Sequence, residues 1–221
     1  MNTNARSPET RVKTPTAGQH ILAAISRGYP LFSGGASITN SSWFTSWSGS
    51  GHGRRAWARV PGGVVNAALD DYVGRACFYV GDLDPKLTWV CKRLIGAGDT
   101  VVDIGANIGL MSVLFAKFVG AKGVVHAFEP NPLLQDVLVE TFERNRATSV
   151  RLHRMALGEE PGVLELCAPS DNAGQGSLVF HKNRADSRRY TVPVRTLSDV
   201  LGEAKTQKVR LIKIDVEGFE L

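Results

Sequence analysis

The chain has 221 residues, 43% of them hydrophobic, which is enough to bury the core of one α/β domain. Its formal net charge of +5 is unevenly distributed, because residues 1–60 hold seven Lys or Arg and one acid, whereas the other 161 residues hold 19 basic and 20 acidic groups. Three cysteines without CxxC spacing argue against a disulfide framework or a zinc site, and no apolar run reaches the roughly 18 residues of a membrane span. With no secretory signal either, we expect a cytoplasmic protein.

Residues 1–60 are expected to form a disordered basic tail. Their Gly and Ser runs and weak periodicity are typical of a segment that cannot offset its ordering entropy by burial. A short apolar helix around His20 to Ile25 is the one element expected there. The arginines and aromatic residues of this tail leave nucleic-acid binding as an alternative, but a solvated linker explains scattered arginines equally well. We therefore expect no nucleic-acid partner.

Residues 61–98 form an upstream segment of strand and helix. Asp84-Pro85 is typical of an N-cap and first turn, and it precedes apolar residues that share one helix face. Asp84 has two interpretations: it is a helix cap, or it is an acid that closes over a bound ligand.

The stretch VVDIGANIG at residues 101–109 is the most informative in the chain, because an apolar strand runs into a glycine turn. Gly105 and Gly109 have no Cβ, so a ligand can approach the backbone closely there. A helix follows from about 109 to 118, and a second strand at 123–128 ends in Glu129. In a right-handed βαβ unit this carboxylate lies beside the glycine turn, where it can accept hydrogen bonds from both ribose hydroxyls of a nucleoside.

The glycine spacing argues against a dinucleotide ligand. A dinucleotide fingerprint is G-x-G-x-x-G and holds a pyrophosphate at the helix N-terminus, whereas here Asp103 precedes Gly105 by two residues. A carboxylate at that place repels a pyrophosphate and suits a cation, such as the ammonium and sulfonium groups of S-adenosylmethionine. A nicotinamide-dependent oxidoreductase remains an alternative, but this sequence lacks the glycine spacing that such an enzyme is expected to have.

The later elements continue the alternation of strands and helices. Asn131-Pro132 predicts the start of another helix, and a third strand follows at 150–155. Two alternating runs, 162–167 and 189–194, predict a hairpin-like insertion, and a capping box predicts a short helix at 197–201. The last strand ends at Asp215. Because the strands of an open parallel sheet end at one crevice, we expect Asp215 to converge there with Asp103 and Glu129.

Three motifs in this order, DIGANIG, AFEPNP and IKIDVEGFE, resemble the FkbM family of S-adenosylmethionine-dependent methyltransferases. The resemblance covers about residues 78–221 and implies an α/β, Rossmann-like class I methyltransferase fold. Its parallel sheet has helices on both faces and strand order 3-2-1-4-5-7-6. Residues 99–221 would be the S-adenosylmethionine-binding domain, incomplete because the last strands are missing. The open edge of strand four then predicts either a longer reading frame or a strand borrowed from a partner, as in a homo-oligomer.

The cofactor S-adenosyl-L-methionine is expected to contact the ends of the first three strands. The turn after the third strand is included because the resemblance to the family implies that the adenine lies there. The expected cofactor-binding residues are Asp103, Gly105, Asn107, Gly109, Glu129, Pro130, Ala156 and Leu157. No dense cluster of His, Asp and Glu demands a metal, so no metal ligands are assigned.

Methyl transfer from a sulfonium mainly requires alignment of the acceptor, and a hydroxyl acceptor must also lose its proton. Asp215, Lys213 and Glu217 are the candidates for the base or for orienting the acceptor. Lys213 has an alternative role as partner of a nearby carboxylate, and Glu217 as a helix-start acid. The resemblance implies O-methylation of a small-molecule or glycan hydroxyl, on a sugar, glycan or secondary metabolite. An inactive or partner-dependent binding module is the alternative.

Overall fold

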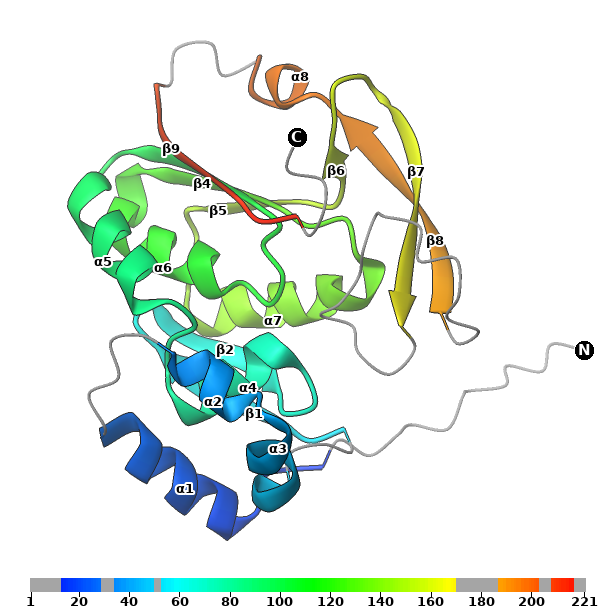
Figure 1. The fold of residues 1–221 in the computed structure, drawn as a ribbon. Helices are drawn as coiled ribbons and strands as arrows, with labels where there is room; N and C mark the ends of the chain where they lie inside the picture. Colours follow the sequence, from blue (N-terminus) through cyan, green and yellow to red (C-terminus); the bar gives the residue numbers. More distant parts are fainter. Residues whose placement is uncertain (1–12, 29–33, 50–52, 170–186, 203–207, 217–221) are drawn as a thin grey trace, which may run out of the picture.

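The computed structural model describes residues 13–28, 34–49, 53–169, 187–202 and 208–216 (Figure 1). Its centre is a four-stranded parallel sheet of order β5-β4-β3-β9. The strands are β3 (Thr100–Ile104), β4 (Val124–Phe128), β5 (Val150–His153) and β9 (Val209–Ile214). The chain adds β4 and β5 on one side of β3 and then returns to the other side for β9. This confirms the order 3-2-1-4 expected for the first four strands.

Helices lie on both sides of this sheet. In Figure 1, α5 (Pro85–Leu94), α6 (Leu110–Val119) and α7 (Gln135–Arg144) lie below the sheet, whereas the short α8 (Leu197–Leu201) lies above it. Residues 100–103 of β3 are buried, and burial on both faces explains why this strand reads as a continuous apolar run. The α/β prediction with a parallel sheet is therefore confirmed.

Short capping contacts set where the helices begin. The Asp84 carboxylate accepts hydrogen bonds from the backbone N–H of Lys86 at 3.0 Å and of Leu87 at 3.3 Å, so the cap interpretation of Asp84 is confirmed. Asn131 opens the 3₁₀ turn η2 (Pro132–Leu134) in the same way and leads into α7. A second 3₁₀ turn, η1 (Gly120–Lys122), joins α6 to β4.

The predicted hairpin-like insertion is present. Strands β7 (Gly162–Pro169) and β8 (Ser187–Arg195) pair antiparallel, and β6 (Ala156–Leu157) pairs parallel with β8 to complete a three-stranded sheet. The Thr196 hydroxyl accepts a hydrogen bond from the Asp199 N–H at 3.0 Å and caps α8, as the capping box predicts.

The prediction of a disordered tail over residues 1–60 is wrong for the described part of that range. It contains α1 (Ala17–Gly28), α2 (Gly35–Thr39), α3 (Ser42–Ser48) and β1 (Arg55–Val60). With β2 (Gly63–Ala68) and α4 (Tyr72–Tyr79) they form an N-terminal lobe, made up of the described residues between 13 and 80. Only the helix around His20 to Ile25 was expected. The short elements are stabilised by contacts that are distant in sequence, such as Phe44 packed edge-on against Tyr79.

The N-terminal lobe packs directly on the sheet domain. The expected boundary after residue 60 falls inside the β1–β2 hairpin, whose strands pair antiparallel. Asn145, just after α7, accepts a hydrogen bond from Val64 N at 2.8 Å and donates one to Val64 O at 2.6 Å. Gly62 lies so close to the α6 backbone that a Cβ there would collide with Leu114. None of the described helices is long and apolar enough to cross a membrane.

Candidate cofactor-binding site

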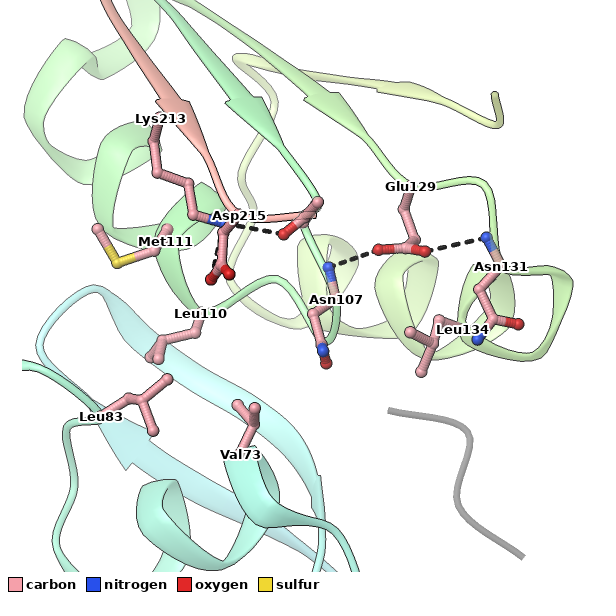
Figure 2. Close-up of a pocket in the computed structure, with 12 residues that line it drawn as sticks. Val73, Leu83, Asn107, Leu110, Met111, Glu129, Asn131, Leu134, Lys213 and Asp215 are labelled. Atoms are coloured by element: carbon pink, nitrogen blue, oxygen red, sulfur yellow. Dashed lines mark hydrogen bonds and ion pairs between the residues drawn. The ribbon is translucent and has the colours of Figure 1, made fainter. Parts of the chain in front are cut away.

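A pocket opens where β3, β4 and β9 end (Figure 2). This is the place where the strand order reverses, and open α/β sheets bind ligands in the crevice at such a switch point. Polar groups from the three strand ends form one side, and apolar residues from α6, η2 and the N-terminal lobe form the other. The lining residues are Val73, Leu83, Gly105, Ala106, Asn107, Leu110, Met111, Glu129, Asn131, Leu134, Lys213 and Asp215.

The two glycines of the turn serve close packing of the chain. Gly105 has φ of 77°, and a Cβ at this position would collide with the backbone oxygen of Asp215. Gly109, with φ of 88°, is the N-cap residue of α6, and a Cβ there would press on Phe142 and Leu138. Gly105 also lines the pocket. The absence of a Cβ at these two positions therefore serves a second purpose besides the approach of a ligand, because it also lets β9 and α7 pack closely against the turn.

Glu129 is a buried carboxylate at the end of β4, with 6% of its surface exposed. One carboxylate oxygen accepts a hydrogen bond from Asn107 N at 2.8 Å, and the other accepts one from Asn131 N at 2.9 Å (Figure 2). Burial raises the pKa of Glu129 to about 7, although these two backbone N–H groups oppose the rise. Each oxygen of a carboxylate can accept a second hydrogen bond, so Glu129 retains capacity for donors from a ligand.

Lys213 connects the strands beneath the pocket. Its ammonium lies 3.2 Å from the carboxylate of Asp103, its neighbour in register on β3, and 3.6 Å from that of Asp215. It also donates a hydrogen bond to the carbonyl of Gly105 at 2.9 Å. Burial lowers the pKa of Lys213, but the two carboxylates outweigh it and hold the pKa above its ordinary value. The side chain therefore remains a cation that fixes the glycine turn.

A family model for the methyltransferase FkbM domain matches residues 103–221, more than half of the chain. This chain belongs to the FkbM family. The match begins at Asp103, in the strand that leads into the glycine turn, and it includes Glu129, Lys213 and Asp215. The family resemblance drawn from the three motifs is thereby confirmed.

Individual relatives in the comparison carry methyltransferase names. The 31-O-demethyl-FK506 methyltransferase FkbM of Streptomyces tacrolimicus is 43% identical over 202 residues, which cover 73% of this chain and 72% of that protein. Methyltransferase 1 of Beauveria bassiana is 30% identical over 138 residues, 55% of each chain. The hexuronic acid methyltransferase AglP of Haloferax volcanii is 31% identical over 125 residues, 56% of this chain and 47% of that protein. This chain thus spans about half the length of the last two.

The FkbM domain brings together two of the three carboxylates that were expected to converge. Glu129 and Asp215 line the pocket, whereas Asp103 is fully buried behind Lys213 and does not. The Ser112 hydroxyl donates a hydrogen bond to Asp103 at 2.6 Å. This corrects the expectation that Asp103 faces a cation of the cofactor. The cation beside the Asp103 carboxylate is instead the ammonium of Lys213.

The other predicted site residues differ in their placement. Asn107 lines the pocket, whereas Pro130 does not. Ala156 is buried against β7 and β8 and Leu157 pairs with Arg195, so the adenine turn does not line this pocket. Glu217 lies outside the described residues.

Sequence reasoning missed the apolar wall and the support for Asp103. Val73 and Leu83 reach the pocket from the upstream chain, and no local pattern marks them as site residues. Ser112 did carry a signal in the sequence, because it is a polar residue within an apolar stretch of α6. Among the described residues, no group of three or more His, Cys, Asp or Glu could hold a metal ion.

Proposed function

We propose that this chain binds S-adenosylmethionine in the pocket at the ends of β3, β4 and β9 and transfers its methyl group to a hydroxyl. The observation that carries the proposal is Glu129, a buried carboxylate held by two backbone N–H groups beside the glycine turn. A carboxylate at the end of the second strand of a βαβ unit is placed to accept hydrogen bonds from ribose hydroxyls. Membership of the FkbM family supports the same cofactor.

The pocket's other residues fit an adenosine-bearing ligand. Its apolar wall, with Leu110, Met111 and Leu134, can cover the flat faces of a purine and exclude water. Val73 and Leu83, from the chain upstream of β3, extend this apolar wall (Figure 2). When bound, S-adenosylmethionine supplies a methyl group on a sulfonium, which needs little further activation. The protein's task is then to orient the acceptor and take its proton.

Asp215 is the candidate for that second task. Its side chain is 64% exposed, lines the pocket, and lies 3.6 Å from the Lys213 ammonium. Because Lys213 is itself anchored to Asp103 and to the Gly105 carbonyl, it can hold the Asp215 carboxylate in place. The raised pKa of Lys213 argues against this lysine as the base, since it stays protonated.

The acceptor class is also a proposal. One relative is named for a 31-O-demethyl acceptor and another for a hexuronic acid, which supports transfer to an oxygen of a sugar or of a secondary metabolite. The alternative is a module that binds the cofactor but lacks transfer activity. We further propose that β9 pairs through its outer edge with another strand, because among the described strands it pairs with β3 alone and exposes Ile212 and Ile214.

Titration calorimetry with S-adenosylhomocysteine tests cofactor binding. We expect Glu129→Gln to weaken binding about 10- to 100-fold, because the amide presents a donor where the carboxylate accepts. Glu143→Gln, on the exposed side of α7, is the matched control and should leave the affinity unchanged. Absence of binding by the folded wild-type protein would contradict the proposal, and tighter binding of NADH would favour the oxidoreductase alternative.

Transfer of a labelled methyl group to glucuronic acid and a panel of related sugars tests the role of Asp215. We expect Asp215→Asn to retain the affinity for S-adenosylhomocysteine within about twofold and to lower transfer about 100-fold. Asp199→Asn in α8 is the control substitution. Unchanged methyl transfer by Asp215→Asn would contradict the proposal that Asp215 is the base.

A further inference from the structure

Helix α1 has its polar side chains turned toward the protein. The Gln19 amide is buried and donates hydrogen bonds to the carbonyls of Ser48 at 3.0 Å and Gly49 at 3.1 Å. The Arg27 guanidinium donates to the carbonyls of Cys77 at 2.7 Å and Phe78 at 2.8 Å. A surface helix of a globular protein ordinarily turns such groups to water. Here they anchor the helix to the lobe instead.

The opposite side of α1 presents apolar side chains to solvent. Ile21 and Ile25, one turn apart, are 62% and 68% exposed, and on α3 Trp43 and Trp47 are 61% and 68% exposed. The two helices are neighbours, because Gln19 of α1 bonds to the end of α3 and a small cavity between them is lined by Leu22 and Trp47. These four residues, Ile21, Ile25, Trp43 and Trp47, are called the outer apolar surface below. Grouped exposed apolar residues mark an interaction site more often than single ones do.

The stretch of sequence that contains the helices of this surface is basic and poor in acids, although the Asp70 carboxylate accepts a hydrogen bond from Gly53 N at 3.0 Å, next to Arg54. From residue 10 to residue 69 the sequence has no Asp or Glu, but it has six Lys or Arg. The backbones of Lys13 and Arg54 pair in an isolated β-bridge beside the start of α1, and the Arg54 guanidinium donates a hydrogen bond to the carbonyl of Thr14 at 3.0 Å. A partner of this surface therefore needs an apolar layer together with negative charge.

We propose that the outer apolar surface docks on a lipid bilayer with anionic headgroups. Trp rings favour the boundary between headgroups and acyl chains, and a helix with one apolar side can lie in that boundary. A second copy of the chain would bring two acid-free regions together, and a nucleic acid would leave Ile21 and Ile25 without a partner. In Figure 1, α1 and α3 lie at the end of the molecule away from β9, so docking leaves the cofactor pocket open.

Co-sedimentation with vesicles tests this proposal. The probes are vesicles of phosphatidylcholine with about 30% phosphatidylglycerol, and vesicles of phosphatidylcholine alone. We expect the wild-type protein to sediment with the anionic vesicles, to bind the neutral ones at least about tenfold more weakly, and to lose binding as salt rises. Its tryptophan emission should shift to shorter wavelength on binding. Failure to sediment with anionic vesicles would overturn the proposal.

Two matched variants locate the surface. Ile21→Gln combined with Ile25→Gln should lower vesicle binding at least about tenfold, because both side chains leave the apolar layer. Val163→Gln, at an equally exposed valine of β7, should bind vesicles like the wild type. Circular dichroism and affinity for S-adenosylhomocysteine should be the same in all three proteins, which separates this proposal from that of the cofactor site. Equal vesicle binding by both variants, or a dimer that only the double variant loses, would overturn it.

Discussion

The sheet domain and the N-terminal lobe use charged and polar side chains in opposite ways. At the ends of β3 and β9, Asp103 and Lys213 are buried, paired with each other and hydrogen-bonded to the chain that forms the pocket. In the lobe, polar side chains of α1 hold a helix in place while apolar ones face outward. At the strand ends the buried charges shape the pocket, whereas in the lobe buried polar groups, such as the Asp71 carboxylate that caps α4, hold helices in place beneath an outer apolar surface.

The largest loss of stability is expected when the buried pair of Asp103 and Lys213 in the sheet domain is broken. Lys213→Met leaves the carboxylate of Asp103 buried without its cation, and we expect it to lower the free energy of unfolding by about 4 kcal/mol. Urea denaturation followed by circular dichroism measures this. Arg210→Met, on the exposed side of the same strand, is the control and should cost at most about 1 kcal/mol. Equal losses in both variants would show that the Asp103 pair has no special weight.

The second effect tests whether the lobe has a real core. Phe44→Ala removes a ring that is buried and packs edge-on against Tyr79. We expect this substitution to lower the free energy of unfolding by about 3 kcal/mol. Ile25→Gln, on the exposed side of α1, should change stability by at most about 0.5 kcal/mol. Thermal melts of the two variants make the comparison. If Phe44→Ala were as mild as Ile25→Gln, residues 13–60 would behave as the tail that their composition predicts.

The third effect concerns the close approach of β9 to the glycine turn. Gly105→Ala adds a Cβ at positive φ that collides with the Asp215 carbonyl. We expect this substitution to lower the free energy of unfolding by at least about 2 kcal/mol and to weaken cofactor binding. Gly98→Ala has a similar φ but open space around its Cβ, so only the backbone strain of about 1 kcal/mol should remain. Denaturation of both variants separates collision from strain.

The smallest effect is a pH dependence of cofactor binding. The pKa of Glu129 is about 7, and ribose hydroxyl donors favour its charged form, so binding must release the proton that the free protein holds at lower pH. Affinity for S-adenosylhomocysteine should therefore be constant above pH 7 and fall up to about tenfold per pH unit below it. Calorimetry at several pH values measures this, and Glu129→Gln should show no such dependence. A wild-type affinity that stays flat between pH 5 and 7 would contradict the ribose role.

The sequence by itself determined the elements whose signals are local. The strand and glycine turn around Gly105, the carboxylate at Glu129 and the cap at Asp84 all follow from periodicity and turn chemistry within a few residues. Only the tertiary structure decided the N-terminal lobe, where Phe44 and Tyr79 meet across 35 positions of sequence, and the pairing of Asp103 with Lys213, which lie on separate strands. It also brought Val73 and Leu83 to the pocket. Such contacts depend on how distant segments pack, and no local pattern records that packing.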